Sequence, residues 1–134
     1  MKVWRVGHKT SRQLDFPSGP YTRRGVPREQ SELLDGMGWS HGDDEHPSPS
    51  FDPALGGIAL HERCGFDSRE ALNKWFDGWL VQLDMADFVV WAYEVPDSAA
   101  RVGKHGQVVF STTDATELGH EPFRREQLDL WEAA

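Results

Sequence analysis

The chain has 134 residues, of which 38% are hydrophobic and 27% charged, and its formal net charge at pH 7 is −8. This length suits one domain over residues 1–134, and the acidic balance argues against binding nucleic acid, which normally requires a basic surface. The single cysteine, Cys64, cannot form an internal disulfide, and no apolar stretch is long enough to cross a bilayer. We therefore expect a cytoplasmic protein with neither a nucleic-acid nor a membrane partner.

The first half of the chain predicts little regular structure. A short strand is expected at Val3–Val6, because β-branched and aromatic residues surround Arg5 there. Residues 7–27 show no clear periodicity and predict a long basic loop, interrupted by a turn at 18–20. Residues 28–35 favour a short helix with Leu33 and Leu34 facing inward, ending at the glycines that follow. Residues 40–57 contain prolines and glycines at intervals too short for regular structure, so they predict a second long loop.

The second half contains the stronger patterns. A helix is expected from Asp67 or Ser68, where Asp67 and Glu70 have the spacing of a capping box and apolar residues follow at helical intervals. Gly78 is expected to close it before a short helix over residues 79–86. Residues 88–95 predict a central strand, because nearly every position is apolar, and residues 102–110 predict a hairpin with its turn at 103–106. The tail from residue 121 to 131 is compatible with a helix or a partly ordered strap.

These elements predict an α+β fold. We expect a mostly antiparallel sheet of four or five strands, with one principal helix packed on a face and two long loops over one edge. Long ordered loops in compact domains tend to be binding elements, so we expect the functional residues in these two loops.

One group of residues is compatible with a metal site, since His41, His46, His61 and Cys64 fall within a short stretch and His61 and Cys64 have a spacing common in zinc sites. The paired Cys-x-x-Cys motif is absent, and Cys64 precedes Gly65 and Phe66 as a small buried residue often does. We expect no metal.

No catalytic motif in the sequence indicates a reaction. Cys64 with His61 would supply a nucleophile and a base, but proximity in sequence is not geometry. The chain has no GxSxG elbow, no phosphate-binding P-loop and no dinucleotide-binding GxGxxG. Whether the protein is an enzyme stays open.

One set of residues predicts a ligand site. Arg5, Tyr21 and His46 supply a cation, an aromatic ring and an imidazole from three separate segments. Such a set can hold a phosphorylated or nucleotide-like ligand, with Arg5 on phosphate and Tyr21 stacked on a base. The alternative is structural: Arg5 pairs with a carboxylate, Tyr21 anchors its loop and His46 caps a turn.

Several short segments carry a resemblance. They are VWRV at 3–6, GPY at 19–21, HPSP at 46–49, CGFDSREALNKWF at 64–76, YEV at 93–95 and VGKHGQVVF at 102–110. Their order resembles that of small uncharacterised accessory proteins of actinobacteria and their phages. The resemblance implies a phage or mobile-element accessory protein, and it carries over no established activity. As our leading hypothesis we expect a protein of the host cytoplasm that binds a host protein, another host macromolecule or a small ligand through its loops, without a cofactor.

A more distant resemblance is to ADP-ribosyltransferase-like domains, which build an NAD pocket from loops over a split sheet. It implies, as the alternative, an NAD-using enzyme with Arg5, Tyr21 and His46 around the cofactor. The family's catalytic glutamate has no clear counterpart, because Glu94 lies in a strand expected to be buried and Glu117 lies in a segment without a clear pattern.

Overall fold

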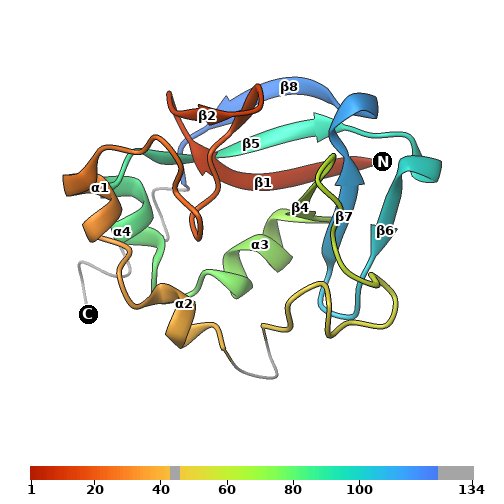
Figure 1. The fold of residues 1–134 in the computed structure, drawn as a ribbon, viewed down its shortest axis with the longest axis horizontal. Coiled ribbons are helices and arrows are strands. Elements are labelled where there is room, and N and C mark those ends of the chain that lie inside the picture. Colours follow the sequence, from red (N-terminus) through yellow and green to blue (C-terminus); the bar gives the residue numbers. More distant parts are fainter. Residues whose placement is uncertain (43–45, 124–134) are drawn as a thin grey trace.

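A computed structural model describes residues 1–42 and 46–123 of the chain. Its main element is a six-stranded sheet in the order β6-β7-β4-β1-β5-β8, and every neighbouring pair is antiparallel (Figure 1). In chain order the strands are β1 (Lys2–His8), β4 (Glu62–Phe66), β5 (Phe88–Glu94), β6 (Ala100–Val102), β7 (Gln107–Ser111) and β8 (Thr116–Glu121). The antiparallel α+β class expected from the sequence is confirmed, with more strands than the four or five predicted.

The sheet is built around β1 and β5, which pair along their whole length from Lys2 opposite Glu94 to His8 opposite Phe88. Most residues of β5 are buried because the strand has neighbours on both sides and packed layers on both faces. β8 differs, since all six of its residues are exposed. It forms one edge of the sheet, and its polar composition is typical of an edge strand.

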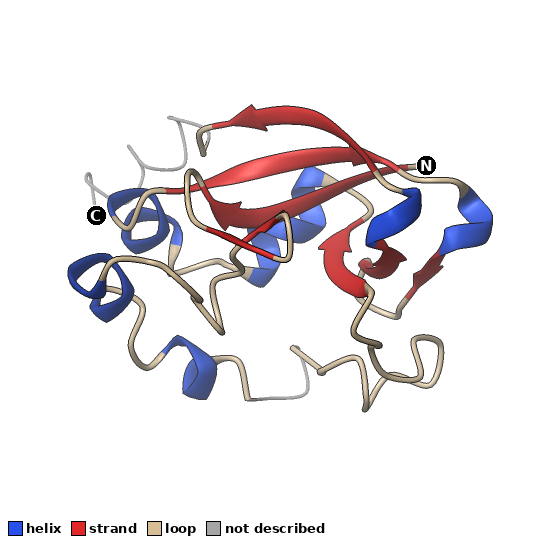
Figure 2. Cartoon of the chain, turned by 45° about the horizontal axis from the view of Figure 1, so that its top comes forward, coloured by secondary structure: helices blue, strands red, loops and turns tan. Residues whose placement is uncertain are grey.

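The remaining elements are short. A two-stranded hairpin, β2 (Arg12–Gln13) and β3 (Phe16–Pro17), lies over the sheet close to β1 (Figure 2). The helices are α1 (Arg28–Glu32), α2 (Met37–Ser40), α3 (Arg69–Trp75) and α4 (Leu80–Met85), with 3₁₀ turns η1 (Asp97–Ala99) and η2 (Thr112–Asp114). Residues 7–27, expected as loop, therefore include the end of β1 and this hairpin.

The sheet has an apolar layer on each face. On one face α3 and α4 bury residues such as Leu72, Trp75 and Leu83 against β1, β4 and β5. On the other face Phe16 from the hairpin packs on Tyr93 and Phe110, and its ring stacks on that of Tyr93 at 4.8 Å between centroids. The hairpin is thus held in place by a ring from its own second strand.

The principal helix begins where the sequence predicted. Ser68 is its N-cap, and its hydroxyl accepts a hydrogen bond from the backbone N–H of Ala71 at 3.0 Å. Gly78 follows the helix with φ of 89°, a conformation that favours glycine, and α4 comes next as expected.

Other expectations need correction. The helix predicted over 28–35 extends only over Arg28–Glu32, and a further short helix, α2, follows it. Leu34 is fully buried as predicted, but Leu33 is exposed, so its inward placement was wrong. The strands β4 and β8 were not predicted. The tail expectation falls mostly beyond residue 123, outside the described residues. No helix in the described part has the length and apolar character to span a membrane.

Candidate functional site

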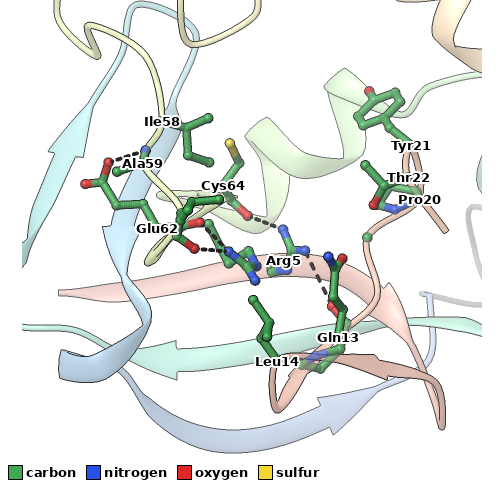
Figure 3. A pocket seen from close by; sticks show the side chains of 14 residues that line it. Arg5, Gln13, Leu14, Pro20, Tyr21, Thr22, Ile58, Ala59, Glu62 and Cys64 are labelled. Atoms are coloured by element: carbon green, nitrogen blue, oxygen red, sulfur yellow. Dashed lines mark hydrogen bonds between the residues drawn. The ribbon is translucent and has the colours of Figure 1, made fainter. Parts of the chain in front are cut away.

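A pocket of about 580 Å³ opens beside β1, between two segments that are far apart in the sequence. One wall comes from the β2–β3 hairpin and residues 19–22, and the other from residues 58–64 (Figure 3). Pockets that hold small ligands have volumes of this order.

Arg5 extends from β1 into this pocket. Its Nη1 donates to the carbonyl oxygen of Cys64 at 2.8 Å, and its Nη2 donates to that of Pro17 at 3.4 Å, as Figure 3 shows. Its Nε is buried without a hydrogen-bond partner. Within the described residues no carboxylate forms an ion pair with Arg5. Burial lowers the pKa of Arg5, but a guanidinium keeps its proton in proteins. The pocket therefore contains a positive charge that no carboxylate of residues 1–42 and 46–123 pairs with.

The rim of the pocket is apolar and exposed. Among the exposed large hydrophobic side chains of the described residues, four line this pocket: Leu14, Tyr21, Ile58 and Leu60. Exposed apolar side chains gathered at one place typically mark a binding surface. A cation below and an apolar rim above can accept a molecule with an anionic end and a flat apolar end.

Leu14 occupies a strained position on this rim. It and Asp15 are the two central residues of the β2–β3 turn, and both have positive φ, 51° and 63°. That combination defines a turn that normally takes Asn and Gly. A leucine there costs of the order of 1 kcal/mol, and the side chain is 74% exposed, so packing within the protein does not compensate for it.

Tyr21 is fixed by its hydroxyl. The Trp75 indole N–H donates to the Tyr21 oxygen at 2.8 Å, and that oxygen lies 2.6 Å from Nδ1 of His41. Burial of the hydroxyl raises the pKa of Tyr21, so it stays neutral and has its own proton to donate to His41. The ring remains exposed toward the pocket.

His46 lies on the other side of this polar cluster. Its ring stacks on His41 with centroids 4.1 Å apart, and its Nε2 donates to the carbonyl oxygen of Trp75 at 2.8 Å. It lines a second pocket of about 700 Å³ with Phe51, Lys104 and other residues, and it does not line the pocket of Arg5 and Tyr21. The structure thus brings two of the three predicted site residues to one pocket and places the third behind it.

Glu62 closes the wall opposite Tyr21. Its carboxylate accepts hydrogen bonds from Arg101, at 2.7 Å and 3.2 Å, and from the backbone N–H of Ala59 at 2.9 Å. The Arg101 hydrogen bond is the main cause that lowers the pKa of Glu62 to about 2. Figure 3 shows this carboxylate turned toward Ala59 and away from Arg5.

Arg63 is the residue that sequence reasoning missed. It lines the same pocket as Arg5, and its Nη1 donates to the carbonyl oxygens of Leu60 and Glu62. The sequence carries no clear signal for it, because Arg63 stands between Glu62 and Cys64 in a strand whose residues do not alternate between polar and apolar.

The cysteine and histidine set considered for zinc is dispersed. His41 stacks on His46, Cys64 lies in β4, and His61 precedes that strand. Across residues 1–42 and 46–123 no three His, Cys, Asp or Glu side chains form a group that could hold a metal ion. Burial raises the pKa of the Cys64 thiol, which disfavours the nucleophilic thiolate.

The two glutamates considered for catalysis are placed elsewhere. Glu94 is the last residue of β5, which is mostly buried as expected, but its own side chain is exposed and accepts a hydrogen bond from the N-terminal amine. Glu117 lies in β8 and pairs with Arg12. Neither lines the pocket.

Comparison with protein families gives one match. Residues 1–124 match the family described as Bacteriophage T4 Y00F protein. The chain belongs to this family. The phage part of the resemblance expected from the sequence is confirmed. No curated protein and no solved structure matches the chain.

Proposed function

We propose that this member of the phage Y00F family is an accessory protein that binds a small anionic ligand between its loops, without catalysing a reaction. The observation that carries the proposal is the guanidinium of Arg5, which lies in a pocket with carbonyl oxygens as its hydrogen-bond partners, while Glu62, the carboxylate in the lining, is bonded to Arg101. A partly buried charge without a counter-ion is unfavourable, and a bound anion removes that cost.

The rim supports a flat apolar group in the same ligand. Tyr21 presents its ring to the pocket with its hydroxyl already fixed by Trp75, so little conformational entropy is lost when a planar group stacks on it. Leu14 adds an exposed apolar side chain at a position where it costs stability. Backbone strain that folding does not require is commonly kept for binding. Nucleotide-like molecules combine these two features.

A thermal-shift assay on the full chain tests the proposal with three probes, AMP, ADP-ribose and NAD. A ligand that binds the folded state raises the melting temperature, and at a given concentration a tighter ligand raises it more. We expect a shift with at least one probe, its loss in Arg5→Gln and its reduction in Tyr21→Ala. The matched variant His46→Ala, outside the pocket, is expected to keep the shift.

Two results would overturn the proposal. One is the absence of a shift with all three probes, which would favour a macromolecular partner. The other is release of nicotinamide from NAD that depends on Arg5. That result would replace the non-catalytic function with the ADP-ribosyltransferase-like alternative.

A further inference from the structure

A second arginine lines the same pocket as Arg5. Arg63 projects from β4, the strand next to β1, and both side chains contribute to one lining. The chain has 14 Lys and Arg residues against 22 Asp and Glu. In a chain with such an excess of carboxylates, we would expect at least one carboxylate to form an ion pair with one of these two neighbouring arginines. No described carboxylate forms an ion pair with either of them.

Both guanidinium groups have donors left over. Arg63 uses only Nη1, which donates to two backbone carbonyls at 3.0 Å and 2.7 Å, so within the described residues its Nε and Nη2 have no partner. Nη1 of Arg5 forms a short hydrogen bond at 2.8 Å, whereas its Nη2 forms only a long one at 3.4 Å, and its unpartnered Nε is buried. The Nε and Nη2 edge of arginine is the fork that binds two oxygens of one anion.

The two charges also act on each other. Burial is the main cause that lowers the pKa of Arg5, and the positive charge of Arg63 lowers it further. The acidic groups that line the pocket do not neutralise these two arginines. Glu62 is bonded to Arg101, and the Cys64 thiol stays protonated because burial raises its pKa. An anion with two negative charges would balance both arginines, whereas a carboxylate would balance one.

We infer that the pocket recognises a phosphate monoester, whose terminal oxygens take the open Nε and Nη2 donors of Arg63 and the weakly bonded Nη2 of Arg5 while its organic group lies on the apolar rim. This inference rests on the proposed ligand-binding function and names the anion. The second ionisation of such a phosphate has a pKa near 6. Its affinity should therefore rise between about pH 5 and pH 7 as the second charge appears.

The experiment compares two probes with the same ring, phenyl phosphate and benzoate, on the ¹⁵N-labelled full chain. Amide shifts report affinity and locate the binding site. For the wild type we expect phenyl phosphate to bind at the Arg5 pocket at least about tenfold more tightly than benzoate at pH 7.5, since one charged pair changes affinity by that order. We expect this preference to fall severalfold at pH 5.

Arg63→Gln should remove most of the preference for phosphate and most of its pH dependence while leaving benzoate within about threefold. Arg63→Lys keeps the charge but loses the two-donor edge of the guanidinium, so its preference for phosphate should lie between those of the wild type and Arg63→Gln. Arg28→Gln is the matched control, because it removes one exposed charge outside the pocket and should leave the affinity for both probes unchanged. Melting temperatures verify that each variant folds.

The possible outcomes distinguish a wrong phosphate assignment from a wrong ligand-binding function. If Arg63→Gln weakens both probes equally or neither, while Arg5→Gln abolishes both, the pocket binds anions but the phosphate assignment is wrong. If phenyl phosphate shifts only amides around Lys104 and His105 in the second pocket, the assignment is also wrong. If no anionic probe shifts amides at the Arg5 pocket, the proposed function fails as well.

Discussion

Gly19 lies directly against the guanidinium of Arg5, and a Cβ at position 19 would come within 2.9 Å of its Nη2. The atom in the way is the far end of a flexible side chain, so an alanine can be accommodated by moving Arg5. The close approach of this loop therefore sets where the cation of the pocket lies.

In Gly19→Ala we expect an affinity about tenfold lower for the probe that raises the melting temperature of the wild type. The free energy of unfolding should change by less than about 1 kcal/mol. Isothermal titration and urea denaturation measure the two effects. Gly38→Ala is the control, because a Cβ there meets no atom within 4 Å. An unchanged affinity in Gly19→Ala would show that the position of Arg5 does not matter.

Leu14→Asn should stabilise the protein and weaken ligand binding. Asn tolerates positive φ better than Leu, so we expect a gain of about 0.5–1 kcal/mol in the free energy of unfolding. Loss of an exposed apolar side chain from the rim should weaken the ligand severalfold. Leu60→Asn, at a rim position that is 91% exposed and does not have positive φ, should weaken the ligand without the gain in stability. Equal stability changes in the two variants would refute the strain argument.

The hydrogen bond between Trp75 and Tyr21 should appear as a coupling energy. In a double-mutant cycle of Trp75→Phe and Tyr21→Phe, we expect the two effects on unfolding to be non-additive by about 1 kcal/mol. Each single variant removes one side of the same bond, so the second change costs less after the first. Strict additivity in urea denaturation would mean that Trp75 does not hold the hydroxyl.

The Glu62 and Arg101 pair predicts a specific acid sensitivity. Arg101 lowers the pKa of Glu62 to about 2 in the folded chain, below its ordinary value of 4.5, so between these values the unfolded chain binds more protons. The stabilisation is therefore complete above about pH 5 and is lost as the pH falls toward 2. Because Arg101 is partly exposed, we expect Glu62→Gln to cost only about 1 kcal/mol at pH 7.

The difference in unfolding free energy between wild type and Glu62→Gln should shrink steadily as the pH falls from 5 to 2. Denaturation at several pH values checks this. Arg101→Gln should reproduce the loss at pH 7, since it removes the other partner of the same pair. A difference that stays constant down to pH 2 would show that ionised Glu62 does not stabilise the fold through Arg101.

The central elements of the fold were predictable because their local patterns were strong. The strand Phe88–Glu94 is apolar at nearly every position, and the helix Arg69–Trp75 has both a cap and apolar residues at helical intervals. β8 was not predictable in this way, since an edge strand open to solvent has no alternating apolar face. β4 contains Glu62 and Arg63 followed by Gly65, residues that lower strand propensity and are compensated only by pairing with β1 and β7.

The site was predictable only in part, for a related reason. Arg5 and Tyr21 could be proposed from residue type, and they line one pocket because the hairpin turns the chain back over β1. His46 could not be placed, since its position depends on stacking with His41 and on the carbonyl of Trp75. Arg63 stayed hidden until β4 was located beside β1.

The most direct test of the central claim is isothermal titration of Arg5→Gln and Lys104→Gln, each against wild type, with the probe that gives the largest thermal shift. Both variants remove one positive charge, Arg5 from the proposed pocket and Lys104 from the second pocket. We expect at least a tenfold loss of affinity in Arg5→Gln and no change in Lys104→Gln. Loss of affinity in Lys104→Gln with Arg5→Gln unchanged would contradict it.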